Sequence, residues 1–332
     1  MYMPLSPSSS SSSLFSKVPK TVKVRWEGLT REGYRLIHGG AWRNPTETAE
    51  NFLSPVSSTM YSSPFYTPSA TKEIAGWASI SYRLSPHPKY PQDPNTTDPY
   101  ELRDAKHPEH IRDVRSALRL LQKTYGFGRR YILAGHSCGA TLSFQCVMPE
   151  FDINTGGPGG SVGGGSISTT SPSPSSPGDD SFIDDGDGYA HPLAILGTEG
   201  VYDIRQLQEA NRQVKLYQQF SETAFGPDRE AWDFVSPAVC RENGSSSVAR
   251  GWRGGRLIVL AHSVEDSLVD VKQLVTMKDS LVSWEEQQDV PTRKVVTLSL
   301  IGEHNDPWMK GEELARAITA TIQELLQLLP VS

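Results

Sequence analysis

The strongest sign of chemistry in the sequence is the stretch GHSCG at residues 135–139, which matches the pattern G-x-S-x-G. A strand-like run, Arg130–Ala134, precedes it, and a helix-like run, Ala140–Val147, follows it. In a tight strand–turn–helix connection of this kind, the serine Oγ faces a pocket and can attack a carbonyl carbon. The pattern predicts Ser137 as the nucleophile of a hydrolase. The alternative is an ordinary serine in a tight turn.

A second glycine-rich motif lies upstream of the first. It comprises His38, Gly39, Gly40, Ala41 and Trp42, directly after the strand-like run Tyr34–Ile37. Acyl transfer builds negative charge on a carbonyl oxygen, and backbone N–H groups must already be in place to meet it. Because glycine lets the backbone approach closely, we expect the N–H groups of Gly39, Gly40 and Cys138 to form an oxyanion hole. The alternative is a simple Gly-Gly turn. His38 precedes the nucleophile in the chain, so we interpret it as a loop-shaping residue rather than the base.

The general base is expected late in the chain, because in hydrolases with such a nucleophile turn the acid and then the base follow the serine. His304 lies in the loop 302–306, between the strand-like run 294–300 and the last helix-like segment. This position, at the end of the last strand, predicts His304 as the base. The alternative is an ordinary surface histidine.

The acid of the triad is expected after the preceding strand-like run, Arg256–Ala261. Glu265, Asp266 and Asp270 all follow that run. We favour Asp266, because it lies at the usual distance past such a strand and just before an apolar pair that begins a helix. Glu265 and Asp270 remain the alternatives. The acid would hold the imidazole tautomer of His304 and stabilise the imidazolium as it forms.

Short apolar runs alternate with helical patterns along the chain. The strand-like runs are 34–37, 77–82, 130–134, 192–196, 256–261 and 294–300. Apolar residues recur at helical spacing in 110–122 and in 312–329. This alternation predicts an α/β fold, with a mostly parallel central sheet covered by helices on both faces.

Two segments of low complexity interrupt this pattern. They are a Ser-rich tail at 1–20 and a Gly/Ser/Pro-rich insertion at about 155–188, and such compositions favour disorder over a packed core. We expect the remaining residues of 21–332 to form one domain, with a small cap segment at about 201–240 over the C-terminal edge of the sheet. Trp42, Tyr202 and Trp232 are candidates to line an aromatic substrate pocket; the alternative is that each packs in the core.

Composition and charge exclude several classes of protein. The net charge of −6 argues against a protein that binds the phosphate backbone of nucleic acids. No window reaches about 18 consecutive apolar residues, so a membrane span is not expected, and no secretory signal is recognisable. Three cysteines do not suggest a disulfide framework, and neither C-x-x-C nor H-E-x-x-H occurs. We therefore expect a cytoplasmic protein without a metal or cofactor.

Four motifs together resemble those of the fungal kynurenine formamidases, which are arylformamidases of the α/β-hydrolase superfamily. The motifs are HGGAW at 38–42, ISYRLSP at 80–86, HPEHIRDV at 107–114 and GHSCG at 135–139. The resemblance extends from about residue 22 to residue 328, except near 155–190. It departs from the HGGG form of many lipases and esterases, because Ala41 stands at the third glycine position.

The resemblance implies an α/β-hydrolase fold and hydrolysis of N-formyl-L-kynurenine to formate and L-kynurenine. That reaction is the second step of tryptophan breakdown towards nicotinamide nucleotides. The resemblance also implies a homodimer. Two alternatives remain open: a broad-specificity carboxylesterase that uses the same triad, and a non-catalytic binding protein with a hydrolase fold.

Overall fold

The computed structural model describes residues 22–26, 32–151, 188–240, 246–287 and 292–329. The Ser-rich tail predicted at 1–20 lies outside these ranges, as does the insertion predicted at 155–188 except for its last residue. Within the described ranges, no helix has both the length and the apolar character needed to cross a bilayer.

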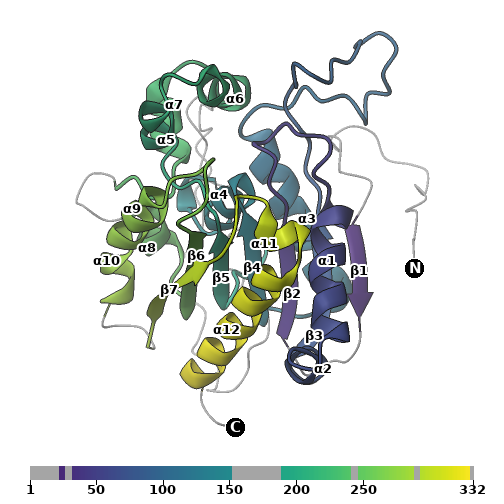
Figure 1. The fold of residues 1–332 in the computed structure, drawn as a ribbon, viewed down its shortest axis with the longest axis vertical. Helices are drawn as coiled ribbons and strands as arrows, with labels where there is room; N and C mark the ends of the chain where they lie inside the picture. The colour runs from purple at the N-terminus through teal and green to yellow at the C-terminus, as the bar shows by residue number, and fades with distance from the viewer. Residues whose placement is uncertain (1–21, 27–31, 152–187, 241–245, 288–291, 330–332) are drawn as a thin grey trace, which may run out of the picture.

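One sheet forms the centre of the molecule, with the strand order β1-β3-β2-β4-β5-β6-β7. Its strands are β1 (Val22–Trp26), β2 (Glu32–Ile37), β3 (Ile74–Ile80), β4 (Tyr131–His136), β5 (Ala194–Thr198), β6 (Leu257–Ser263) and β7 (Lys294–Leu300). The first strand pairs antiparallel with β3, and all other neighbours pair parallel. The predicted mostly parallel sheet is confirmed (Figure 1).

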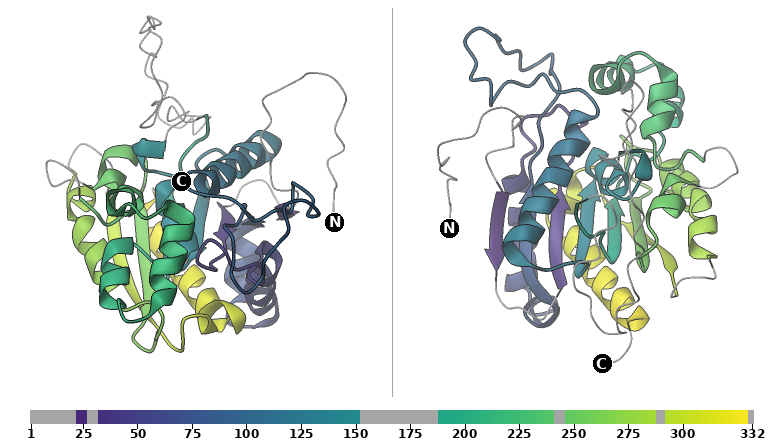
Figure 2. Two further views of the ribbon diagram at one scale, coloured as in Figure 1. Left: turned by 90° about the horizontal axis from the view of Figure 1, so that it is seen from above. Right: turned by 180° about the vertical axis from the view of Figure 1, so that it is seen from behind.

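Helices cover both faces of this sheet. One face carries α1 (Ala49–Ser62), α2 (Thr67–Glu73), α11 (Asp306–Met309) and α12 (Glu312–Leu328). The opposite face carries α3 (Glu109–Tyr125), α4 (Cys138–Gln145), the short 3₁₀ helix η1 (Pro149–Phe151), α8 (Ser247–Gly251), α9 (Lys272–Ser280) and α10 (Val282–Glu285). Figure 2 (right) shows this second face from behind, with α3 lying in front of the sheet and running roughly along the strands.

The strands β3, β4, β5 and β6 are buried along their whole length, because each of them packs side chains on both faces of the sheet. In β4, Tyr131 and Leu133 pack into the cluster beneath α3 and α4. Ile132 and Ala134, which alternate with them, pack into the cluster beneath α1 and α12. Side chains of a strand alternate between the two faces, so a doubly covered strand reads as a continuous apolar run.

Three further helices lie beyond the C-terminal ends of the central strands. They are α5 (Ile204–Ala210), α6 (Lys215–Phe225) and α7 (Arg229–Val235), drawn in green at the top of Figure 1. They fall within residues 201–240, the segment for which the sequence predicts a cap. The loops that follow β2, β4, β6 and β7 leave the sheet at the same edge, which is the edge on whose side these helices lie (Figure 1).

Candidate active site

Ser137 occupies a strained turn between β4 and α4. Its φ of 54° and ψ of −123° place a non-glycine residue in a conformation that costs free energy and that is found at functional turns. A Cβ on Gly135 would lie 2.2 Å from the carbonyl oxygen of Gly139, and a Cβ on Gly139 would lie 2.2 Å from that of Ile37. Strand and helix therefore approach each other closely only because both flanking residues are glycine.

His304 and Asp266 come from the loops after β7 and β6. The Nδ1–H of His304 donates to Oδ2 of Asp266 over 2.7 Å, and both side chains are buried. Oδ1 of Asp266 accepts the backbone N–H groups of Leu268 and Val269, each at 2.8 Å. Burial alone would raise the pKa of Asp266, but the hydrogen bond and charge of His304 and these N–H groups outweigh it and lower the pKa below its usual value.

The two alternative acids lie elsewhere. Glu265 is exposed and its carboxylate accepts the backbone N–H of Gly302 at 3.1 Å. Asp270 is also exposed and caps the backbone N–H of Lys272 at 2.8 Å. The structure therefore brings Asp266, and neither of these carboxylates, into hydrogen-bond contact with His304.

The HGGAW loop lies against Tyr82, which follows β3. The Tyr82 hydroxyl lies 3.1 Å from the carbonyl oxygen of His38 and 3.0 Å from that of Gly39. In a trans peptide the C=O and the N–H point in opposite directions, so the N–H groups of Gly39 and Gly40 face away from Tyr82. Among the described residues, none accepts a hydrogen bond from these two N–H groups or from the N–H of Cys138.

His38 contributes to the shape of this loop. Its ring stacks on that of Tyr82 with 4.6 Å between centroids, and its Nδ1 lies 3.0 Å from the carbonyl oxygen of Gly39. Burial, only partly offset by the Gly39 carbonyl, lowers the pKa of His38 to about 4, so the imidazole is neutral near pH 7. The following residues, Ala41 and Trp42, both have positive φ angles, which gives the loop its tight turn.

Two unequal cavities meet at Ser137. The larger, of about 250 Å³, is also lined by His304, Gly40, Arg43, Glu47 and Phe220, among others. The smaller, of about 30 Å³, is apolar; Trp42, Cys138, Val201 and Val269 are among its lining residues. Ser137, Ala41, Phe220 and Leu268 line both cavities. The predicted nucleophile and base thus open onto one space, although Ser137 itself is only 6 % exposed.

Of the three aromatic residues predicted to line the substrate pocket, only one lines a cavity at Ser137. Trp42 lines the smaller cavity, whereas Tyr202 and Trp232 line neither. Tyr202 packs against Gly197 and Gly200, where a Cβ would lie within 2.2 Å of its ring or hydroxyl. Trp232 is buried and donates its indole N–H to the carbonyl of Gly226. These two side chains hold the α5–α7 region onto the core rather than reaching the cavity, because large aromatic surfaces gain most from full burial.

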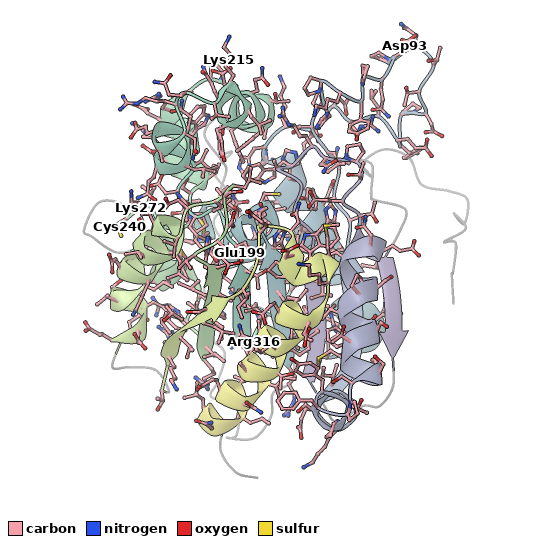
Figure 3. All side chains as sticks on the ribbon, in the orientation of Figure 1. Asp93, Glu199, Lys215, Cys240, Lys272 and Arg316 are labelled. Atoms are coloured by element: carbon pink, nitrogen blue, oxygen red, sulfur yellow. The ribbon has the colours of Figure 1, made fainter. Side chains whose placement is uncertain are left out.

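Glu199, which the sequence analysis did not single out, lies beside Asp266. It follows β5 with a φ of 47°, it is 0 % exposed, and Figure 3 labels it near the centre of the molecule. Its two carboxyl oxygens lie 3.1 and 3.2 Å from the backbone N–H of Ser263. Burial and the negative charge of Asp266 raise the pKa of Glu199 to about 9. Glu199 is therefore the protonated partner at neutral pH.

Glu199, His262 and Asp266 lie close enough together to suggest a cation site. Their hydrogen bonds favour a different interpretation. Nε2 of His262 lies 2.8 Å from the carbonyl oxygen of Val269, so this nitrogen carries the proton that a metal would have to replace. Asp266 already accepts three N–H groups. Nε2 of His262 also lies 3.2 Å from Glu199 Oε2 and 3.6 Å from Asp266 Oδ2, so the three side chains form a polar cluster next to His304, and we assign no metal to them.

No protein-family model matches the chain. The chain is 33 % identical over 303 residues to a kynurenine formamidase-like hydrolase of Fusarium equiseti, which covers 91 % of this chain and 87 % of that protein. It is 32 % identical over 293 residues to a kynurenine formamidase of Aspergillus versicolor, with 83 % of each chain covered. The chain belongs to the kynurenine formamidase family. The resemblance inferred from the four sequence motifs is thereby confirmed.

The fold of this kynurenine formamidase family member matches solved α/β-hydrolase structures. A truncated carbohydrate esterase from gut microbiota superposes with a TM-score of 0.53 over 93 % of this chain and 92 % of that chain, at 16 % identity. At that identity the likeness establishes the fold alone. The predicted α/β-hydrolase fold is confirmed, with β4, the Ser137 turn and α4 in the arrangement of a nucleophile elbow.

Proposed function

We propose that this protein is a serine arylformamidase that hydrolyses N-formyl-L-kynurenine to formate and L-kynurenine. Its relatives are named kynurenine formamidase or kynurenine formamidase-like hydrolase. The observation that carries the proposal is the inequality of the two cavities at Ser137, about 30 and 250 Å³. A formyl group needs almost no acyl pocket, whereas the aryl amino acid that leaves needs a large one.

Ser137, His304 and Asp266 act as the catalytic triad in this proposal. His304 takes the proton of Ser137 Oγ as Oγ bonds to the formyl carbon, and the carbonyl oxygen gains the negative charge. The C–N bond then breaks, and His304 returns the proton to the departing aniline nitrogen. Water adds to the formyl-enzyme, giving its proton to His304, which passes it to Ser137 Oγ as formate leaves. Asp266 holds the His304 tautomer and stabilises the imidazolium.

The N–H groups of Gly39, Gly40 and Cys138 donate hydrogen bonds to the negatively charged oxygen of the tetrahedral intermediate. Their lack of acceptors among the described residues supports this role. Cys138 also supplies the first N–H of α4, where the helix dipole favours negative charge. Tyr82 acts as a positioning residue, because it holds the carbonyls on the opposite side of the same peptide units.

The proposal is tested by comparing acyl groups on one leaving group. The purified protein is given N-formyl-, N-acetyl- and N-butyryl-kynurenine, and kynurenine release is followed. Because overpacking a filled pocket costs about 1–3 kcal/mol, kcat/KM should fall about 5- to 150-fold on going from formyl to the longer acyl groups. Equal or faster turnover of the longer groups, or of butyryl esters, would instead indicate a broad carboxylesterase.

The family membership also leads us to propose a homodimer that acts in tryptophan breakdown, and we further propose that the protein is cytoplasmic. Sedimentation of the full chain across a dilution series tests the assembly: a single species of twice the chain mass supports the dimer, and a monomer at all concentrations contradicts it.

A further inference from the structure

The larger cavity holds two side chains of opposite charge that do not neutralise each other. Arg43 is only 3 % exposed, and no carboxylate lies within ion-pair distance of it among the described residues. Glu47 is partly buried, and its Oε1 accepts the side-chain amide of Asn44 at 3.1 Å. Both line the same cavity as Ser137 and His304.

Within the part of the chain that the structure describes, the Arg43 guanidinium lacks the partner that a buried cation normally has. Burial lowers the pKa of Arg43, which reflects the cost of removing its charge from water. The Phe220 ring centroid lies 6.0 Å away, at the outer limit of a cation–π contact. Buried charges are otherwise paired, and Arg is suited to bind a carboxylate with two parallel hydrogen bonds. An unpaired, buried Arg that faces a cavity therefore indicates an anionic ligand group.

Glu47 supplies the opposite charge next to the reacting serine. Its Oε2 lies 3.0 Å from where a Cβ on Gly39 would be, and Cβ of Ser137 lies 3.1 Å from that same point. Burial raises the pKa of Glu47, while its Asn44 contact and the nearby His304 act in the opposite direction. A bound ammonium group would lower the pKa of Glu47 again, because a nearby positive charge favours the ionised carboxylate.

We propose that Arg43 binds the α-carboxylate of the substrate and that Glu47 holds its α-ammonium group. The pair would make the site selective for a formylated arylamine that carries an amino-acid zwitterion, rather than for any formanilide. The inference rests on the proposed function for the identity of the reacting bond. Apolar lining from Leu216, Phe220 and Leu268 would face the aromatic ring of the same ligand.

The test compares two substrates and three variants. The substrates are N-formylkynurenine and its decarboxylated analogue, which keeps the formamide, the ring and the amine. The variants are Arg43→Met, Arg43→Lys and the control Arg212→Met, which removes an exposed guanidinium from the loop between α5 and α6. Steady-state kinetics give kcat and KM for each combination.

Arg43→Met should lower kcat/KM for N-formylkynurenine about 10- to 100-fold, mainly through KM, as expected for loss of a charge-assisted hydrogen bond. Turnover of the decarboxylated analogue should stay within about threefold of the native enzyme, because that substrate never used Arg43. Arg43→Lys should recover part of the loss, since it keeps the charge without the two parallel hydrogen bonds. Arg212→Met should match the native enzyme on both substrates.

A merely structural role for Arg43 predicts different results. The Arg43→Met variant would then lose the same factor on both substrates and would unfold at a lower temperature. On our proposal its unfolding temperature is equal to or above that of the native chain, because an unpaired buried charge is removed. An equal loss on both substrates overturns the assignment of Arg43 and leaves the formamidase proposal intact.

A second measurement does not require formamidase turnover. L-Kynurenine and its decarboxylated analogue are compared as inhibitors of 4-nitrophenyl acetate hydrolysis. L-Kynurenine should inhibit about tenfold or more strongly in the native protein, and Arg43→Met should abolish the difference. Equal inhibition by the two compounds in the native protein overturns the assignment, whether or not N-formylkynurenine is hydrolysed.

The Glu47 half of the proposal has a matched experiment. A substrate that lacks the α-amine but keeps the carboxylate is compared with N-formylkynurenine in the native protein and in Glu47→Gln. The native protein should favour the amine-bearing substrate, and the variant should lose that preference. If Glu47→Gln slows both substrates by the same factor, Glu47 acts on the loop or on His304 and not on the ammonium group.

Discussion

The loops after β5 and β6 each bury a carboxyl group behind His304, yet the two groups are in opposite protonation states. Asp266, in the β6 loop, accepts three N–H groups including that of His304, and its pKa lies below the usual value. Glu199, in the β5 loop, has one backbone N–H and faces the charge of Asp266, and its pKa is raised. Both carboxyl groups are buried, but only at Asp266 do His304 and two backbone N–H groups outweigh the cost of burial; at Glu199, burial and the charge of Asp266 prevail.

This difference suggests a division of labour between the two loops. The β6 loop supplies the charged partner that fixes the His304 imidazole. The β5 loop supplies a neutral acid that can donate a hydrogen bond to Asp266 and so hold it in place. Three experiments test whether the two carboxyl groups differ in this way.

The largest effect is expected from Asp266→Asn. An amide of the same shape can hold the wrong imidazole tautomer, and in a serine protease that replacement costs about 10⁴ in kcat. We therefore expect kcat on N-formylkynurenine to fall by about three to four orders of magnitude in a folded variant. The controls Glu265→Gln and Asp270→Asn remove exposed carboxylates and should stay within about tenfold. If Glu265→Gln lowered kcat severely and Asp266→Asn only slightly, the charged partner of His304 would be Glu265 and not Asp266.

A smaller effect is expected on stability in Glu199→Gln. The pKa of Glu199 is raised above its unfolded value near 4.5 to about 9, with burial as the main cause. Between these values the folded state holds a proton that the unfolded chain has released. The contribution of Glu199 to stability is therefore complete below about pH 4.5 and is lost as the pH rises through about 9.

Glu199→Gln removes this dependence. Relative to the native chain, the free energy of unfolding of the variant should rise with pH between 5 and 9, by at most about 1.4 kcal/mol per pH unit for one proton. Urea unfolding at several pH values measures it. A constant difference between variant and native chain across that range would mean that Glu199 titrates normally.

The smallest effect is expected on activity in the same variant. A glutamine amide can donate to Asp266 as the protonated acid does, so kcat/KM at pH 7 should stay within about threefold. Above about pH 9 the native enzyme should lose about tenfold, because two facing carboxylates repel and displace Asp266 from His304. The variant should keep its activity there. Parallel pH profiles of variant and native enzyme would contradict a role of Glu199 in positioning Asp266.

Much of the fold is predictable from the sequence, because buried parallel strands can be recognised as runs of apolar residues. The runs at 34–37, 77–82, 130–134, 192–196, 256–261 and 294–300 all overlap strands of the sheet. The edge strand β1 and the helix α1 were not predicted. The first is short and alternates apolar with charged residues, and the second contains Pro55, a residue that usually ends a helix.

In the candidate site, too, some residues could be predicted from the sequence and others could not. Ser137, His304 and Asp266 could be chosen from chain order, because this fold places the ends of its central strands at one edge. Glu199 could not, since a Glu-Gly pair after a strand looks like any loop, and its importance comes from Asp266 in the loop after the neighbouring strand β6. The same holds for Arg43, whose position next to HGGAW was visible but whose missing counter-charge is a property of the folded cavity.

In the proposed mechanism, Ser137 forms a covalent formyl-enzyme where the two cavities meet. The most direct measurement is release of formate and L-kynurenine from N-formyl-L-kynurenine by the native chain and by Ser137→Ala, with folding compared by circular dichroism. The variant removes one oxygen and should fold normally, while turnover falls by several orders of magnitude because triad members act as a unit. Turnover by Ser137→Ala within tenfold of the native chain would contradict the account.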